Sequence, residues 1–387
     1  MVEPFVISLM ADGAESGRPA TLVSGRILVH TPHGLNPIDR LLAEAAAEVP
    51  ASRILTVMHP DPIVALAMRA LRPESAVEFF HMDLFHVTQV SRVARRHGFA
   101  DLSAICAPNL PAGAERPQMI LMHTRRDDEA GLTLEWIHQG HAALAPGGKL
   151  LAAINNPHDQ WLRRQLERTF GNLTIAGRSK HGLVYLVKRA GADETAPADH
   201  QFIKRVRADW GGLELECETC YGVFNSGGLD EGSRALLEVM EPLAPGGALF
   251  NPGSNWGAMG LLAAKKYEAS RLLLVDSNSR SVQMARRNAE KNLPGRAEVR
   301  HEFEGDHFLN DEEWGAFDTV IANPPYATEM RVTEMFVRLA QRALKRGGKV
   351  WMVGKNNIKM VELVHEVFGD AQAHNRRGYL IASATRA

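Results

Sequence analysis

The sequence predicts an α/β fold with two tandem domains, each a doubly wound and mostly parallel sheet with helices on both faces. Three observations predict it. The 387 residues are too many for one typical domain and suit two. Short apolar runs typical of buried strands alternate with segments of helical periodicity throughout the chain. The order of these elements in the second half repeats that of the first at an offset of roughly two hundred residues, which indicates a duplication.

The first half alternates predicted strands and helices. Asn36 and Pro37 lie at the head of the first segment with helical spacing and favour a helix start there. The residues before them are expected to form a loose start. The predicted helices are residues 35–49, 63–71, 84–95 and 132–144, and the predicted strands are residues 53–58, 77–82, 119–122 and 149–154.

Residues 191–199 interrupt this pattern with small, polar and proline residues. We expect them to link two domains, residues 1–190 and 200–387. In the second domain the predicted helices are residues 229–240, 259–267, 280–292 and 332–344, and the predicted strands are residues 248–250, 271–275 and 349–353, together with the run that ends at Asn323. A turn is expected at residues 345–348.

Short motifs recur at matching places in the two halves. Pro146-Gly147-Gly148-Lys149 corresponds to Arg346-Gly347-Gly348-Lys349, Phe170-Gly171 to Phe368-Gly369, and Asp83 to Asp276. The copies differ where chemistry is expected, because residues 123–126 are His-Thr-Arg-Arg and the turn at residues 59–62 has no glycine. A cofactor's charged tail needs the close backbone approach that glycine permits. We therefore expect residues 1–190 to form a degenerate, non-catalytic copy.

The composition limits the class of protein. The formal net charge of -1 and the pI near 7.0 give no overall attraction to nucleic acid, so such binding requires local basic patches. Cys217 and Cys220 have the spacing of a metal or redox pair, but they lack a second pair and lie in an alternating, strand-like stretch. We interpret them as incidental reduced cysteines. Because neither a membrane-spanning run nor a leader is apparent, we expect a cytoplasmic protein.

The most informative stretch is the apolar run 318–322, which stops at Asn323-Pro324-Pro325-Tyr326. Two consecutive prolines end the strand, so the backbone turns at its carboxyl end, where open α/β sheets bind ligands. The side-chain carbonyl of Asn323 and the backbone carbonyl of Pro324 are then two fixed acceptors, and Tyr326 offers a flat face. This arrangement is typical of a pocket for the exocyclic NH₂ of a base or an amide.

A second group of residues indicates a cofactor site. Gly253 and Gly257 flank the turn after the domain's first predicted strand, and Asp276 ends the next, where an acid commonly bonds ribose hydroxyls. Asn255 occupies a position that favours positive φ, which asparagine tolerates. Asp306 ends what we expect to be the third strand, where its carboxylate is placed to accept from an adenine amine.

The chain resembles the ribosomal RNA guanine-N2 methyltransferases of the small-domain methyltransferase superfamily over nearly its full length. The resemblance rests on these two groups of residues and on the run 222–233, Gly-Val-Phe-Asn-Ser-Gly-Gly-Leu-Asp-Glu-Gly-Ser. The resemblance implies two Rossmann-like class I methyltransferase domains, the second active, and S-adenosylmethionine as methyl donor. It implies catalytic roles for Asn323, Pro324, Pro325 and Tyr326, the first two holding the guanine amine. The implied cofactor-binding residues are Asn251, Gly253, Ser254, Asn255, Gly257, Asp276, Ser277, Asp306 and Asn323.

Two departures from the family pattern concern this site. The family's first turn begins with an acid, whereas this chain has Asn251, which removes one expected contact to the cofactor's ammonium, and Trp256 adds bulk. The guanine enzymes usually carry phenylalanine at the position of Tyr326, and tyrosine is familiar in methyltransferases of adenine amines and glutamine amides. An adenine amine and a protein glutamine amide are therefore alternative substrates. A non-enzymatic RNA-binding or ribosome assembly factor is a further alternative.

The expected partner is ribosomal RNA or a ribosomal subunit, with the target base single-stranded or flipped out of its helix. Basic clusters that are able to contact phosphates are residues 92–96, 125–126, 204–207 and 376–377. We expect a monomer without a membrane partner. We also expect no metal, because no metal-ligand cluster is apparent in the sequence.

Overall fold

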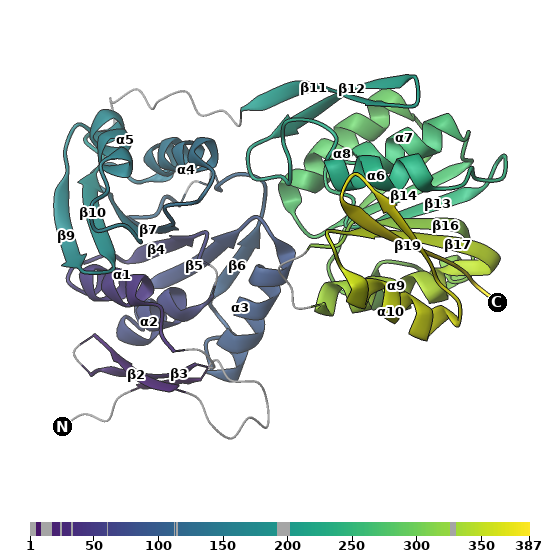
Figure 1. Cartoon of the computed structure of the whole chain (residues 1–387). Coiled ribbons are helices and arrows are strands. Elements are labelled where there is room, and N and C mark those ends of the chain that lie inside the picture. The colour runs from purple at the N-terminus through teal and green to yellow at the C-terminus, as the bar shows by residue number, and fades with distance from the viewer. Residues whose placement is uncertain are drawn as a thin grey trace. The chain divides into compact units, whose positions relative to one another are not determined.

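The structure is a computed structural model that describes residues 5–8, 18–23, 25–31, 34–59, 61–111, 113, 115–191, 202–325 and 330–387. The chain divides into two compact units, Met1–Gln201 and Phe202–Ala387 (Figure 1). The expected linker, residues 191–199, lies just before this division and, apart from Gly191, outside the described residues.

The amino-terminal unit is built on a seven-stranded sheet of order β6-β5-β4-β7-β8-β10-β9. The first five strands of this order are parallel, and β10 and β9 are antiparallel to their neighbours. The strands are β4 (Arg53–Val57), β5 (Ala76–His81), β6 (Ser103–Cys106), β7 (Met119–Thr124), β8 (Lys149–Ile154), β9 (Thr174–Ser179) and β10 (Gly182–Lys188). The helices are α1 (Pro37–Ala47), α2 (Ile63–Leu71), α3 (Leu84–Arg96), α4 (Ala130–Ala143) and α5 (Trp161–Phe170).

The carboxyl-terminal unit repeats this plan with the order β15-β14-β13-β16-β17-β19-β18. Its strands are β13 (Ala248–Pro252), β14 (Arg271–Asp276), β15 (Ala297–His301), β16 (Phe317–Ala322), β17 (Leu344–Gly354), β18 (Gln372–Arg376) and β19 (Tyr379–Thr385). The helices are α6 (Glu231–Val239), α7 (Ala258–Lys266), α8 (Ser279–Asn292), α9 (Arg331–Ala343) and α10 (Ile358–Phe368), with 3-10 turns η1 (Gly305–His307) and η2 (Asp311–Glu313). A hairpin of β11 (Ile203–Trp210) and β12 (Leu213–Cys220) precedes them. The predicted fold class and duplication are confirmed.

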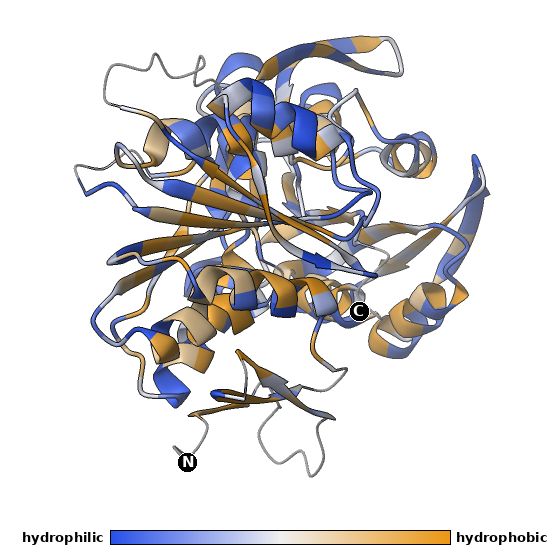
Figure 2. Cartoon of the chain, turned by 90° about the vertical axis from the view of Figure 1, so that its left-hand side faces the viewer, coloured by the Kyte–Doolittle hydropathy of each residue, from blue (hydrophilic) through white to orange (hydrophobic). Residues whose placement is uncertain are grey.

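Each sheet separates two hydrophobic cores because successive strand residues point to opposite faces. In β7, Leu121 belongs to the core that includes α1, α2 and α3, whereas Ile120 and Met122 belong to the core that includes α4 and α5. Figure 2 shows the central strands as mainly hydrophobic and the helices as mixed. Both faces are thus covered, which leaves the strand ends and loops to carry polar chemistry.

Three expectations differ from the observed elements. The residues before Asn36 include a three-stranded sheet of β1 (Phe5–Ser8), β3 (Ile27–Thr31) and β2 (Arg18–Leu22) where a loose start was expected. The expected turn at residues 345–348 is a bulge inside β17, because Leu344 pairs with Phe317 and Lys349 with Thr319. The predicted third strand of the second domain ends at His301, five residues before Asp306.

The two cysteines of the CxxC pair lie on β12 as expected, and neither forms a disulfide. Both are buried, and burial raises the pKa of the Cys217 thiol to about 12, which keeps it protonated and unreactive. Among the helices that the structure describes, none is long and apolar enough to cross a membrane.

Candidate active site

A pocket in the carboxyl-terminal unit lies at the carboxyl ends of β13 and β16. Its walls combine Asn323, residues 253–256 of the turn after β13, and residues from the run 222–233 that precedes α6. The structure therefore brings together three segments that the sequence singled out separately. This edge of a parallel sheet is where α/β proteins place their ligands.

Asn323 follows β16, and its amide is held in one orientation. Its Nδ2 donates to Asp230 Oδ2 at 2.8 Å and to Ser233 Oγ at 3.2 Å. Because an ionised carboxylate only accepts, the group that faces Asp230 must be the NH₂, and the Asn323 carbonyl oxygen lies on the other side of the amide. Asp230 is the N-cap of α6 and accepts from the Ser233 backbone N–H at 2.9 Å, so the helix start fixes its carboxylate.

The remaining members of the predicted catalytic tetrad are described only in part. Pro324 is buried and Pro325 is exposed, as expected for a turn that leaves the sheet. Tyr326 lies outside the described residues. The catalytic roles of these three residues stay predictions.

The turn after β13 has the backbone that its glycines and asparagine predict. Gly253, Asn255 and Gly257 have φ of 63°, 53° and 91°, which confirms the positive φ expected at Asn255. A Cβ on Gly253 would lie 2.9 Å from the Phe336 ring, and one on Gly257 would lie 3.1 Å from Leu274. The positive φ favours glycine at both positions, and at Gly253 the Phe336 ring also leaves too little room for a Cβ unless the ring shifts.

Asp276 ends β14, as predicted, and its carboxylate supports the turn. Its Oδ2 accepts from the Asn255 backbone N–H at 2.7 Å, and its Oδ1 accepts from the Asn278 N–H at 2.9 Å. The acid is therefore held at the turn after β13, where a ribose is expected. Its predicted bond to the ribose stays a prediction.

Two residues of the turn differ in role from the sequence-based expectation. Asn251 was expected to contact the cofactor, but its side chain is fully buried beneath the turn and donates to the Ile321 carbonyl at 3.0 Å, so it ties β13 to β16. Trp256 was expected to add bulk at the turn. It is 2% exposed, and its indole N–H donates to the Asn225 carbonyl at 3.3 Å, so most of its bulk packs into the core.

Ser277 and Asp306 lie outside the walls of this pocket. The Ser277 carbonyl lies 2.8 Å from His301 Nε2, which ties the loop after β14 to the end of β15. Asp306 lies in η1, its side chain is 77% exposed, and it forms an ion pair with Arg342 of α9. Its expected position at a strand end is wrong, because β15 is short and only partly buried.

The sequence did not reveal how the run 222–233 is held. Side chains of the turn and of the α8 segment donate to its backbone carbonyls: Asn255 to Phe224, Trp256 to Asn225 and Asn278 to Gly222. Arg280 donates to the carbonyl of Tyr221, the residue just before the run. Phe224 lines the pocket and remains 57% exposed. In the sequence, only the family-specific run 222–233 indicated that this loop belongs to the site. The same run contains Asp230 and Ser233.

The first copy carries a histidine at the position of the cofactor acid. The register of β4 with β5 and of β13 with β14 aligns His81 with Asp276, and Asp83 with Asn278. The match of Asp83 to Asp276 was therefore off by two residues. His81 Nδ1 accepts from the Asp83 N–H at 2.9 Å, as the acid does in the other copy. Burial lowers the pKa of His81 to about 3, so the side chain is neutral.

The same edge of the amino-terminal unit holds a buried cluster that the sequence did not reveal. His123 Nδ1 lies 2.6 Å from Asp39 Oδ1, and His59 Nδ1 lies 3.5 Å from the same oxygen. Burial opposes ionisation of Asp39, but the hydrogen bond with His123 and the nearby His59 ring outweigh it and hold the pKa of Asp39 well below its usual value. Burial, with the Asp39 charge, raises the pKa of Asp61. The expectation of no metal-ligand cluster overlooked these residues, which are far apart in the sequence.

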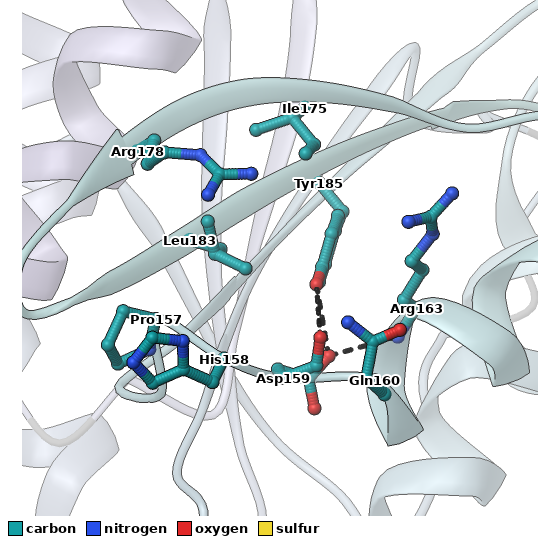
Figure 3. A pocket seen from close by; sticks show the side chains of 9 residues that line it. All are labelled: Pro157, His158, Asp159, Gln160, Arg163, Ile175, Arg178, Leu183 and Tyr185. Atoms are coloured by element: carbon teal, nitrogen blue, oxygen red, sulfur yellow. Dashed lines mark hydrogen bonds between the residues drawn. The ribbon is translucent and has the colours of Figure 1, made fainter.

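A different pocket of the amino-terminal unit, between α5 and the β9-β10 hairpin, has no such chemistry. Its lining is drawn in Figure 3, where Tyr185 donates from its hydroxyl to the Asp159 carboxylate at 3.1 Å. Asp159 in turn accepts from two N–H groups at the start of α5. The Tyr185 and Asp159 groups therefore serve the local fold, and the pocket is separate from the carboxyl edge that carries the candidate site.

The amino-acid sequence of this chain is similar to those of known methyltransferases. The model of the methyltransferase small domain matches residues 214–383. Ribosomal RNA small subunit methyltransferase C of Pseudomonas aeruginosa is 28% identical over 260 residues, which cover 63% of this chain and 73% of that protein. Ribosomal RNA large subunit methyltransferase G of Stutzerimonas stutzeri is 29% identical over 243 residues, which cover 60% of this chain and 61% of that protein.

A solved structure extends the likeness to both units. The 16S rRNA guanine N2 methyltransferase of T. thermophilus, in complex with AdoMet and guanosine, matches with a TM-score of 0.76 at 22% identity, over 96% of this chain and 98% of that chain. The shared fold thus includes the duplicated amino-terminal copy. The match to the methyltransferase small domain lies within the carboxyl-terminal unit, which carries the pocket.

Proposed function

We propose that this protein transfers a methyl group from S-adenosylmethionine to an exocyclic amine of a base in ribosomal RNA, with guanine N2 as the target. The observation that carries the proposal is the Asn323 amide, which lines the pocket and whose NH₂ is bound by Asp230 and Ser233, so that its orientation at the end of β16 is fixed. The relatives named as ribosomal RNA methyltransferases and the guanosine complex of the T. thermophilus protein support the substrate class.

An exocyclic amine is a weak nucleophile because its nitrogen lone pair is delocalised into the ring. Acceptors that draw the amine hydrogens out of the ring plane favour a more tetrahedral nitrogen with a localised lone pair. The Asn323 side-chain carbonyl and the Pro324 backbone carbonyl are assigned this task. Catalysis then rests mainly on positioning, since the reacting groups are held at a fixed distance and orientation.

The turn after β13 fits S-adenosylmethionine. Gly253 and Gly257 leave its backbone without side chains, and Asp276 is bonded to the same turn through the Asn255 N–H. These residues are proposed to hold the cofactor, with the Asp276 carboxylate accepting from ribose hydroxyls. When bound, the cofactor supplies an electrophilic methyl group for direct displacement.

The amino-terminal unit is proposed to be a copy that binds no cofactor. The acid position holds the neutral His81, and the position of Asn323 holds His123. The turn after β4 has no glycine, and Met58 and Pro62 stand at the positions of Gly253 and Gly257. None of these residue types provides the acceptor carboxylate and open backbone that the second copy offers.

The basic residues expected to contact phosphates differ in the interactions that they make in the structure. Arg376 and Arg377 form ion pairs with Glu238, so a phosphate has to compete with that carboxylate. Arg125 and Arg126, in contrast, line a pocket of the amino-terminal unit that also includes Trp161. The latter pair is therefore the better candidate for an RNA contact.

The proposal is tested by incubating the protein with methyl-labelled cofactor and one of three substrates: deproteinised ribosomal RNA, intact small subunits, or intact large subunits. Digestion of the RNA to nucleosides then identifies the product. The expected result is label in N2-methylguanosine from at least one RNA-containing substrate. Label in a methylated adenosine, or in a glutamine of a ribosomal protein, would replace guanine by one of the alternative substrates.

A catalytically dead control separates methyl transfer from RNA binding. Asn323→Ala removes the amine acceptor but leaves the glycine turn and Asp276 in place. Absence of label with every substrate, combined with retained RNA binding by both proteins, would favour a non-enzymatic RNA-binding factor instead.

A further inference from the structure

The amino-terminal unit contains a buried group of metal-ligand type, formed by Asp39, His59 and His123. Their side chains are 0%, 1% and 3% exposed. They come from α1, from the turn between β4 and α2, and from the end of β7. One potential ligand atom from each lies within 4.8 Å of the other two, and no other group of this kind is found in the part of the chain that the structure describes.

The hydrogen bonds of the two histidines fix where their protons lie. His59 Nε2 lies 3.2 Å from the Leu121 carbonyl, which only accepts, so Nε2 carries the proton. A neutral His59 therefore has a lone pair on Nδ1, which faces Asp39 Oδ1. That oxygen already accepts from His123 Nδ1. Within the described residues, His59 Nδ1 and Asp39 Oδ2 have no hydrogen-bond partner.

Two electron-rich atoms thus face each other without a donor between them, inside the protein. Burial of unpaired polar atoms costs free energy, and burial of a carboxylate with one unpaired oxygen costs more. A cation bound between His59 Nδ1 and the Asp39 carboxylate removes both costs.

The distances are close to those of a tetrahedral Zn²⁺ site. Ligand atoms at about 2.0–2.2 Å from Zn²⁺ lie about 3.3 Å from one another. The separation of His59 Nδ1 and Asp39 Oδ1 is 3.5 Å. The separation of His123 Nδ1 and Asp39 Oδ1 is 2.6 Å and must lengthen by about 0.7 Å, and the proton on His123 Nδ1 must move to Nε2 so that Nδ1 can bind the ion. Rotation of the carboxylate about its Cβ–Cγ bond lengthens it and brings in Oδ2.

The group occupies the place of the catalytic amide in the other copy. The registers of β7 with β8 and of β16 with β17 align His123 with Asn323. Asp39 and Ser233 each lie three residues after the N-cap of the helix that precedes the first parallel strand. The first copy has thus exchanged a neutral, half-buried amide for two histidines and a carboxylate, which is a change in chemistry and not a mere loss of residues.

We propose that Asp39, His59 and His123 bind a divalent transition-metal ion, with Zn²⁺ the best fit to two imidazoles and one carboxylate. The ion joins α1 to the ends of β4 and β7. Because the three side chains are buried, its role is to stabilise the amino-terminal unit.

The test uses the full chain, stripped with a chelator and titrated with Zn²⁺ alone against a chromophoric competitor. The expected result is one tightly bound Zn²⁺ per chain and a rise in the melting temperature on metal addition. Substitution by Co²⁺ should give the visible absorption of a site with nitrogen and oxygen ligands. Absence of tight Zn²⁺ uptake by the parental chain would overturn the proposal.

Variants locate the ion. His59→Gln and His123→Gln should each lose the tightly bound Zn²⁺. His158→Gln, at an exposed histidine of the same unit, should still bind one Zn²⁺ tightly. Cys217→Ala should also keep it. Loss in Cys217→Ala, or a thiolate charge-transfer band in the parental Co²⁺ spectrum, would place the metal at the cysteines and contradict the assignment, even if the histidine variants fail to fold.

Discussion

At the end of β16, the orientation of one amide depends on two side chains from another part of the chain. Asn323 Nδ2 donates to Asp230 and Ser233, which lie at the start of α6. Asp230 defines the orientation more strongly, because a carboxylate cannot donate and so excludes the flipped amide. Asp230 is thus a positioning residue in the proposed reaction.

Substitution of Asp230 by asparagine tests this role without removing the helix cap. Asparagine caps helices about as well as aspartate, so α6 should be retained. Its amide is able to donate toward Asn323 and allows the Asn323 amide to flip. We expect kcat to fall about 10- to 100-fold, which corresponds to about 1.5–3 kcal/mol for a bond to a charged group.

Ser233→Ala is the matched control, because it removes only the longer contact of 3.2 Å. It should lower kcat by less than about fivefold, within ~1 kcal/mol. Cofactor affinity should be unchanged in both variants, as measured by calorimetry. Parental kcat in Asp230→Asn would show that the orientation of the amide does not depend on the carboxylate.

At this scale, local backbone rules predicted well and long-range partners did not. The positive φ of Asn255 follows from its place between two glycines in a tight turn. The family resemblance assigned Asn251 to the cofactor site, and only the packing of β13 against β16 shows its side chain to be buried. The hydrogen-bond partners of Asn323, Asp230 and Ser233, lie in the run 222–233 that the sequence analysis singled out. Their contact with Asn323 arises from the tertiary fold, so the sequence alone did not predict it.

At the scale of elements, β14, β15 and η2 are joined by a partly buried ionic network around Glu313. Its side chain is 8% exposed and accepts from Arg300 through both oxygens, at 2.7 Å and 2.8 Å. Arg271 of β14 forms an ion pair with the same carboxylate. Burial opposes ionisation of Glu313, but hydrogen bonds from Arg300 and Arg271 outweigh it and lower its pKa to about 2.

The network predicts acid sensitivity of the carboxyl-terminal unit. The folded pKa of Glu313 lies below the ordinary value of 4.5, so its contribution is present in full above pH 4.5 and is lost as the pH falls toward about 2. Glu313→Gln should therefore lower the free energy of unfolding at pH 7 by ~2 kcal/mol, and the difference from the parental protein should shrink below pH 4.5. Urea unfolding at several pH values measures this.

Glu290→Gln, at an exposed position of α8, is the control and should change stability by less than about 0.5 kcal/mol at any pH. A pH-independent difference for Glu313→Gln would contradict the assignment of the shifted pKa to this carboxylate.

Strands that are mostly buried were predicted more accurately from the sequence than strands that are only partly buried. Strands β8 and β14 are apolar and were located to within a residue. Strand β15 is only partly buried, so it lacks an apolar run, and Asp306 was misplaced as a result. The bulge at residues 345–348 contains a glycine at positive φ and reads as a turn, yet both of its flanks pair with β16.

At the scale of the whole molecule, the two units share one fold but have different side chains at the carboxyl ends of their central strands. Strand order and pairing are the same in the two units. The two units differ at the carboxyl ends of the central strands, where His81 stands in place of Asp276 and His123 in place of Asn323. The duplication and the match of residues 123–126 to residues 323–326 were visible in the sequence, whereas the match of His81 to Asp276 required strand register.

This asymmetry predicts one S-adenosylmethionine per chain. Calorimetry on the full protein should give a stoichiometry of one. Asp276→Ala should weaken binding by about 1.5–3 kcal/mol, the value of a charge-assisted hydrogen bond. A stoichiometry of two would contradict the proposed degenerate copy, and unchanged affinity in Asp276→Ala would place the ribose elsewhere.

The central claim is that the Asn323 carbonyl orients a substrate amine, and single-turnover methylation by Asn323→Ala tests it most directly. Parental protein and variant are saturated with labelled cofactor and mixed with the same ribosomal RNA substrate, and cofactor affinity is measured in parallel. The predicted result is a loss in the single-turnover rate of about 100-fold or more, with cofactor affinity within about twofold of the parental value. Methylation by Asn323→Ala at the parental rate would contradict the claim.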